Sequence, residues 1–211
     1  MTTEDPILYQ KDGRIIRITI NRPSKRNALT QQMLKDLDQA FARADEDADA
    51  CVVVLRGAGE QAFCAGADLS TMSGGAFLET YDARSLFPNL FLRMLRHGKP
   101  TLAAVNGHCV AGGMGLMLAC DLAIAKAGSK FGTPEIARGL FPFMISALIS
   151  RTVPRRSARE MMLLGETFSA ERAEELSLVN RTVHAEDFDA EVERWAQKLA
   201  SYSPAVLRLG R

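Results

Sequence analysis

The sequence has almost no excess charge and few cysteines. Its 26 Lys and Arg residues against 25 Asp and Glu residues leave a formal net charge of +1, so no basic field of the kind that binds duplex nucleic acid is expected. Cysteines stand at positions 51, 64, 109 and 120 without any C-x-x-C pair, which argues against a zinc ribbon or a redox pair. All four lie in apolar stretches, so we expect buried, reduced thiols and no metal site.

Long apolar runs are also missing. No uninterrupted stretch is long enough to cross a bilayer, and the acidic beginning MTTEDPILYQ lacks the pattern of a secretory signal. These absences predict no membrane partner and a cytoplasmic location. The composition, 47% hydrophobic and 24% charged over 211 residues, is typical of a globular chain with one sizeable core. No linker or change of composition divides the chain, so we expect a single domain over residues 1–211.

Hydrophobic periodicity predicts strands and helices in alternation. Short β-branched or apolar runs predict buried strands: 15–20, 51–55 and 101–105. The segment 116–125 is apolar throughout and is expected to begin as helix and end as strand. Residues 70–87 show little periodicity and predict a substrate-shaping loop. Elements that alternate over short links indicate the α/β class.

Capping signals mark where several helices begin. Thr30 precedes a helical pattern of apolar residues and is expected to be its N-cap. Ser157 and Glu160 have the spacing of a capping box, in a helix that should stop at Gly165. A second cap is expected at Ser169, and a last helix over residues 187–200.

Two glycine-containing segments could bring backbone N–H groups close to a ligand. These are Ala65-Gly66-Ala67-Asp68 and Ala111-Gly112-Gly113-Met114-Gly115. Neither has the Lys and Ser/Thr of a Walker loop or the spacing of a dinucleotide-binding loop. Two such loops near helix starts can aim free N–H groups at one oxygen atom. From the glycines alone, two ordinary tight turns explain the pattern equally well.

Two side chains outside these loops are candidates for proton transfer. Glu135 follows Pro134 between apolar residues, and burial would raise the pKa of its carboxyl toward the range of a general acid or base. The alternative is a solvent-exposed glutamate at a helix start. His108 lies between Gly107 and Cys109, and we expect it to be packed rather than catalytic.

The ordered set of motifs resembles the enoyl-CoA hydratase/isomerase, or crotonase-like, family. The resemblance covers nearly the whole chain, and the set is far more specific than any single motif. The segments that carry it are Asn21-Arg22-Pro23, Asn27-Ala28-Leu29, Ala62-Phe63-Cys64-Ala65-Gly66-Ala67-Asp68-Leu69, Ala104-Val105-Asn106-Gly107, Gly112-Gly113, Cys120-Asp121, Phe131-Gly132-x-Pro134-Glu135, Gly165-Glu166, Ala170-Glu171-x-Ala173 and Leu178-Val179-Asn180.

The resemblance implies the crotonase fold, a spiral of ββα units with C-terminal helices. It implies an acyl-CoA thioester as substrate, no separate cofactor, and a homotrimer or a hexamer made of two trimers. The backbone N–H groups of Ala67 and Gly112 would hold the thioester oxygen, and Glu135 would act as acid and base. The residues implied along the coenzyme A moiety and the acyl group are Arg26, Ala28, Ala65, Asp68, Leu69, Ser70, Gly113, Gly115 and Phe143.

The sequence departs from the hydratase pattern at Gly115, where hydratases of the family carry a second glutamate. Water addition needs a group that orients the water, whereas a double-bond shift needs one base. Hydration, isomerisation, another enolate reaction such as decarboxylation, and non-catalytic binding of a CoA thioester therefore all stay open. Glu79 and Asp82 are candidates for a second acid.

Two further departures concern the apolar residues near the site and the end of the chain. Phe141-Pro142-Phe143-Met144 stands where many relatives have small residues, which predicts a more apolar site floor. Relatives usually continue past Arg211, so we expect their trimerisation helices to be mostly absent here.

Overall fold

The computed structural model describes residues 5–68 and 77–211, and all of their side chains except those of 77–84. The strands are β1 (Ile7–Asp12), β2 (Ile15–Ile20), β3 (Val52–Gly57), β4 (Ala62–Cys64), β5 (Thr101–Val105), β6 (His108–Val110), β7 (Leu122–Lys126), β8 (Lys130–Gly132), β9 (Thr167–Ser169) and β10 (Arg181–Val183). The α-helices are α1 (Gln31–Glu46), α2 (Phe77–Leu95), α3 (Gly112–Ala119), α4 (Phe143–Thr152), α5 (Arg155–Leu164), α6 (Ala170–Glu175), α7 (Phe188–Ala200) and α8 (Pro204–Gly210). The short 3-10 helices are η1 (Pro23–Lys25) and η3 (Pro134–Arg138).

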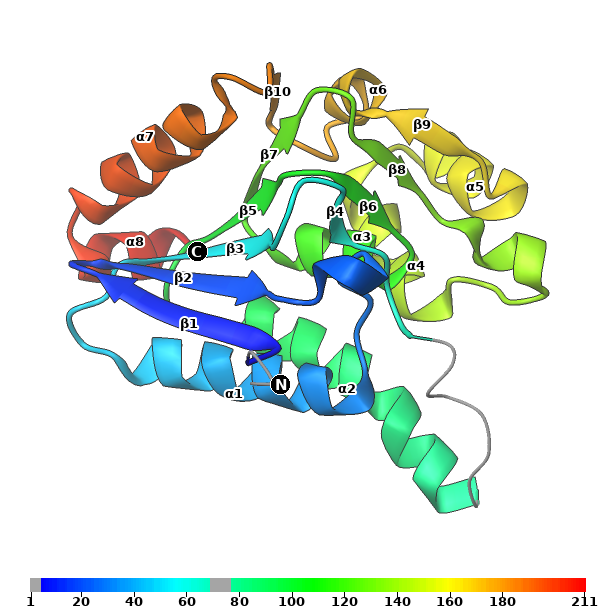
Figure 1. Cartoon of the computed structure of the whole chain (residues 1–211), viewed down its shortest axis with the longest axis horizontal. Coiled ribbons are helices and arrows are strands. Elements are labelled where there is room, and N and C mark those ends of the chain that lie inside the picture. Colours follow the sequence, from blue (N-terminus) through cyan, green and yellow to red (C-terminus); the bar gives the residue numbers. More distant parts are fainter. Residues whose placement is uncertain (1–4, 69–76) are drawn as a thin grey trace.

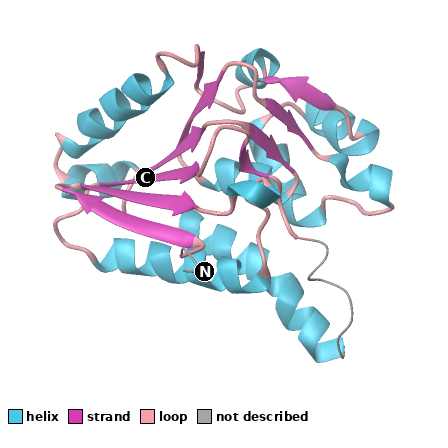
Figure 2. Ribbon diagram, in the orientation of Figure 1, coloured by secondary structure: helices cyan, strands magenta, loops and turns pink. Residues whose placement is uncertain are grey.

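Two sheets organise the chain (Figures 1 and 2). The larger one has the order β1-β2-β3-β5-β7-β10, with β1 antiparallel to β2 and every other pair parallel. The smaller one has the order β4-β6-β8-β9, with β4, β6 and β8 parallel and β9 antiparallel. Successive ββα units therefore add one strand to each sheet, which confirms the expected α/β class.

Helices cover both faces of the larger sheet, which explains why its central strands β3, β5 and β7 are mainly buried and apolar. Successive residues point to opposite faces: Ile15 packs with residues of α7, whereas Ile16 packs with residues of α1. In the same way Val52 and Val53 belong to different sides of the sheet. Figure 1 shows α1 and α2 along one face and α7 along the other. Within the described residues, no helix is long and apolar enough to cross a membrane.

Most of the elements expected from the sequence are confirmed. The three predicted strands correspond to β2, β3 and β5, and the segment 116–125 divides into the end of α3 and β7. Thr30 caps α1 by accepting a hydrogen bond from the Met33 N–H at 3.2 Å. Ser169 caps α6 in the same way, with Arg172 N–H as donor at 3.2 Å.

Four expectations from the sequence are wrong. The helix expected over 187–200 forms as α7 but is not the last, because α8 follows it. The expected loop over 70–87 is helical from Phe77 onward; residues 69–76 lie outside the described part of the chain. The capping box at Ser157 does not form, because α5 starts earlier, after Pro154. His108 is exposed rather than packed, and its Nδ1 accepts a hydrogen bond from Lys130 N–H.

The cysteines match the expectation in most respects. Cys51, Cys64 and Cys109 are buried free thiols, and Cys120 is a half-buried free thiol. Burial raises the pKa of the Cys64 thiol to about 12, so this side chain is not a nucleophile near neutral pH.

Candidate functional site

The candidate site lies at the carboxyl ends of three neighbouring parallel strands. Strands β4, β6 and β8 pair side by side, with Cys64 opposite Cys109 and Val110 opposite Gly132. The segments that follow them begin at Ala65, Ala111 and Thr133. They leave the sheet at the same edge, which is where ligands bind in open parallel sheets. Topology therefore brings together the two glycine segments and Glu135, which are far apart in sequence.

The first glycine segment is held beside residues 26–29 by backbone hydrogen bonds. Ala65 N–H donates to the Arg26 carbonyl at 3.1 Å, and Leu29 N–H donates to the Gly66 carbonyl at 2.8 Å. Asp68 N–H in turn donates to the Leu29 carbonyl at 2.8 Å. This is a parallel bridge between Leu29 and Ala67. Because successive N–H groups of an extended chain point in opposite directions, the N–H of Ala67 points away from Leu29.

The second glycine segment lies directly against the first. A Cβ atom added to Gly66 would be 2.9 Å from the Gly112 nitrogen, and Gly66 has a φ of +85°. A Cβ added to Gly113 would overlap the Cys64 carbonyl oxygen. The glycines are therefore required by the close approach of two backbones, as well as by backbone conformation.

Free donors remain at the start of α3. Met114 N–H bonds to the Ala111 carbonyl at 2.9 Å, whereas the N–H of Gly112, the first residue of α3, has no acceptor within its own helix. Ala111 adopts a φ of +52°, rare for a residue with a Cβ, and its N–H bonds to the Gly132 carbonyl at 2.9 Å. This turn directs the start of α3, the positive end of its dipole, toward Gly66.

Glu135 provides the ionisable group of the site. It lies in η3, and its Oε2 is buried without a hydrogen-bond partner among the described residues. Burial raises the pKa of the carboxyl above the ordinary value of 4.5, an effect that Arg138 partly offsets. Thr133 fixes the start of η3, because its buried hydroxyl donates to the Met161 carbonyl of α5 at 2.7 Å. The sequence left two alternatives for Glu135, a buried acid or a solvent-exposed glutamate at a helix start. The structure shows a half-buried carboxyl.

The first glycine segment also contains an ion pair that the motifs did not reveal. Arg22 Nη1 donates to Asp68 Oδ2 at 2.6 Å and to the Ala28 carbonyl at 3.1 Å. Asp68 thus has a structural partner on the neighbouring segment. Arg26, by contrast, is exposed at a φ of +52° and lines a separate surface pocket with His108 and Lys126.

Asn27 is a second feature that sequence reasoning missed. Its side chain is fully buried, and Nδ2 donates to the carbonyls of Ala58 at 3.0 Å and Ala62 at 2.7 Å. Oδ1 accepts from Arg22 N–H at 3.0 Å. The only sign in the sequence was the position of Asn27 within a motif segment. Amides buried inside proteins normally form hydrogen bonds with the backbone.

Gly115 and Phe143 differ in their surroundings. Gly115 is buried one turn below Gly112, where Phe91 and Ile145 pack against it. Phe143 is 76% exposed at the start of α4, with its ring centroid 4.8 Å from that of Phe141. Within this segment's helix, Ile145 is buried beside Gly115 whereas Phe143 is mostly exposed, and the apolar site floor remains a prediction. Leu69 and Ser70 lie outside the described residues, as do the side chains of Glu79 and Asp82.

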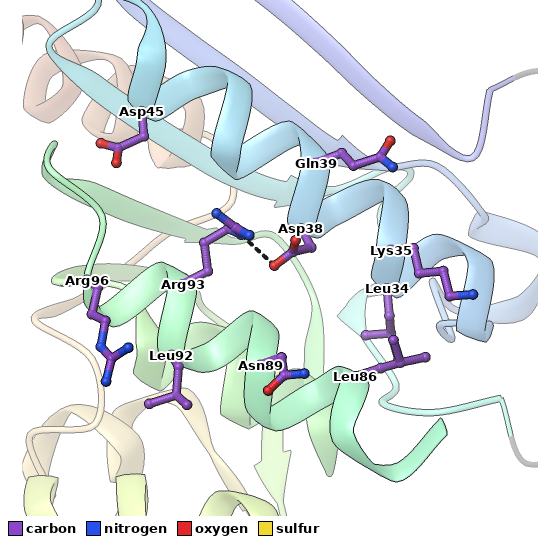
Figure 3. A pocket seen from close by; sticks show the side chains of 10 residues that line it. All are labelled: Leu34, Lys35, Asp38, Gln39, Asp45, Leu86, Asn89, Leu92, Arg93 and Arg96. Atoms are coloured by element: carbon purple, nitrogen blue, oxygen red, sulfur yellow. Dashed lines mark hydrogen bonds and ion pairs between the residues drawn. The ribbon is translucent and has the colours of Figure 1, made fainter. Parts of the chain in front are cut away.

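Another hollow lies away from these residues. A groove of about 650 Å³ runs between α1 and α2, lined in part by Lys35, Asp38, Arg93 and Arg96 (Figure 3). An ion pair of 2.5 Å joins Arg93 and Asp38 across it. None of the candidate site residues that the structure describes lines this groove. Among the described residues, no group of three or more His, Cys, Asp or Glu side chains could hold a metal ion.

Comparisons with known proteins agree with the motifs and with the fold. The sequence profile of the family described as Enoyl-CoA hydratase/isomerase matches residues 10–210. A short-chain-enoyl-CoA hydratase of Clostridium acetobutylicum is 32% identical over 97% of this chain and 79% of its own length. A probable enoyl-CoA hydratase of Rhizobium meliloti is 37% identical over 96% of this chain and 79% of its own length.

Solved structures give the same result. An enoyl-CoA hydratase from Mycobacterium smegmatis superposes with a TM-score of 0.94 at 35% identity, covering 98% of this chain and 81% of the other. The hydratase from Bacillus anthracis gives a TM-score of 0.93 at 30% identity. These structures confirm the crotonase fold expected from the motifs. Together with the profile match over almost every residue, they show that this chain belongs to the enoyl-CoA hydratase/isomerase family.

Proposed function

We propose that the chain processes acyl-CoA thioesters through an enolate, with Glu135 as the acid and base. The observation that carries the proposal is the contact between Gly66 and Gly112 at the carboxyl ends of β4 and β6. A half-buried glutamate, whose Oε2 has no partner among the described residues, follows the neighbouring strand β8. The N–H groups of Ala67 and Gly112 would hold the thioester oxygen. Coenzyme A is part of the substrate, and no separate cofactor is required.

The chemistry follows from where charge develops. Removing a proton from the carbon next to a thioester places negative charge on the carbonyl oxygen. One well-aimed donor to such an oxygen contributes about 3 kcal/mol to transition-state stabilisation. Proton transfer by a positioned carboxylate adds roughly 10²–10⁴-fold in rate. The raised pKa of Glu135 suits this role, because a base whose pKa is closer to the pKa of its substrate transfers a proton more readily.

Replacement of the carboxylate tests the proposal. Glu135→Gln should lower turnover of 3-hexenoyl-CoA or crotonyl-CoA by roughly 10²–10⁴-fold while thioester binding is retained. Glu160→Gln, an exposed glutamate on α5, is the matched control and should keep wild-type rates. If the wild-type protein binds both thioesters tightly and converts neither, the chain is a non-catalytic CoA-thioester-binding protein and the proposal is wrong.

We also propose a homotrimer, or a hexamer of two trimers. Exposed apolar side chains support a subunit contact on α5 and α8, where Leu163 is 56%, Leu164 61% and Leu209 89% exposed. Sedimentation equilibrium measures the assembly directly, and a monomer at all concentrations would contradict it. The expected cytoplasmic location remains a prediction from the sequence.

A further inference from the structure

Two glycines on one face of α3 separate the candidate oxygen-binding point from the floor of the site. Gly112 and Gly115 are three residues apart, so they lie one helical turn apart on the same side. A Cβ at Gly112 would meet the Phe87 ring at 2.8 Å and the Gly66 Cα at 3.4 Å. A Cβ at Gly115 would overlap Phe91 Cζ and lie 2.5 Å from Ile145 Cγ2. The space one turn below the oxygen-binding point is therefore already filled.

Among the described residues, the atoms nearest to this position are apolar. The three atoms nearest to a Cβ at Gly115 all belong to Phe91 or Ile145. Both side chains are buried, with 4% and 2% of their surfaces exposed. The Phe91 ring is tilted against the Phe87 ring, with centroids 5.6 Å apart. Phe87, one turn earlier on α2, therefore packs against Phe91. We call Phe91 and Ile145 together the apolar wall.

An apolar wall disfavours one class of reaction at this site. Adding water to the β-carbon of a 2-enoyl thioester requires a polar group that holds and deprotonates the water. Neither member of the wall has a hydrogen-bonding side chain, and an ordered water needs two or more polar partners. A carboxylate introduced at position 115 would collide with the wall before it could reach the substrate.

We propose that Phe91 and Ile145 are specificity-determining residues that restrict the site to proton transfer, with 3-enoyl thioesters as the substrate class. Glu135 removes a proton from C2, and the electron pair spreads over the thioester oxygen and C4. The same carboxyl returns the proton to C4, so the C3=C4 double bond becomes C2=C3 and no atom is gained or lost. This inference rests on the proposed role of Glu135.

The wild-type protein provides the first test, in water enriched in oxygen-18. We expect conversion of 3-hexenoyl-CoA to 2-hexenoyl-CoA, with hydration of crotonyl-CoA at least about 100-fold slower, the loss expected when water activation is missing. Mass spectrometry of the products should then show no heavy oxygen. Hydration as fast as isomerisation would overturn the inference while leaving the role of Glu135 intact. Turnover of neither substrate would instead refute the proposed function, and the inference with it.

Variants of the wall provide the second test. Gly115→Glu alone should gain no hydration, whereas Gly115→Glu combined with Phe91→Ala should raise hydration of crotonyl-CoA by about tenfold or more, because the carboxylate then has room. The matched control combines Gly115→Glu with Leu90→Ala, which opens a buried position on the same helix but on another face. Circular dichroism selects the folded variants. Equal gains with Leu90→Ala, or no gain in a folded Phe91→Ala variant, would contradict the proposal; if that variant does not fold, the isotope experiment decides alone.

Discussion

At the scale of single residues, Glu135 combines two properties that oppose stability. Its carboxylate is partly desolvated, and no described residue offers Oε2 a hydrogen bond. Because the pKa of Glu135 is higher in the folded chain than in the unfolded chain, the folded state binds the proton more tightly. Stability therefore falls as the pH rises from the ordinary value of 4.5 through the folded pKa, and ionised Glu135 destabilises the fold at neutral pH.

The raised pKa predicts that Glu135→Gln raises the melting temperature at pH 7 while it lowers turnover. The difference in melting temperature from wild type should shrink as the pH falls, because the wild-type carboxyl takes up its proton. The apparent pKa on the acid side of the pH profile of kcat/KM should also lie above 4.5. Thermal unfolding at several pH values measures the effect, with Glu160→Gln as control. A melting temperature that falls at pH 7 would show that the ionised carboxylate has an undetected stabilising partner.

At the scale of elements, local signals were sufficient for several strands and helices but not for the site. Ile15–Ile20 and the segment after Thr30 could be predicted because side-chain period and capping are local properties. The missed start of α5 has a local cause: the helix begins at Arg155, directly after Pro154, whose backbone is compatible with a helix start, so Ser157 lies inside the helix. The contact of Gly66 with Gly112 depends on parallel pairing of β4 and β6, which no single segment encodes. Only the resemblance suggested it.

The same contact leads to a prediction about the backbone of the first glycine segment. Ala67→Pro removes one N–H from the proposed oxyanion hole, and the loss of one such donor lowers kcat by about 10²–10³-fold. The core should remain folded, because the Leu29 bridge uses the groups of Gly66 and Asp68 instead. Steady-state kinetics and the thermal melt measure the two effects separately. Wild-type kcat in a folded Ala67→Pro variant would contradict the oxyanion assignment.

At the scale of the whole molecule, one side chain near the C-terminus joins three distant parts of the chain. Arg211 Nε donates to Asp121 Oδ2 at 2.6 Å, and its Nη2 donates to the Met94 carbonyl at the end of α2. The same carboxylate oxygen accepts the N–H and hydroxyl of Thr101, at 2.7 and 2.8 Å, at the start of β5. The Arg211 side chain is only 10% exposed. Helix α8 is therefore attached to the sheet through Asp121.

Breaking this attachment should lower the stability of the entire fold. Arg211→Met leaves a partly buried carboxylate with fewer donors, and a hydrogen bond to a charged group contributes about 1.5–3 kcal/mol. Urea unfolding should show that decrease as a lower midpoint with an unchanged slope. Arg208→Met, on the exposed side of α8, should stay within about 0.5 kcal/mol of wild type. Equal losses in the two variants would mean that apolar packing of α8, rather than the carboxylate of Asp121, holds this end of the chain in place.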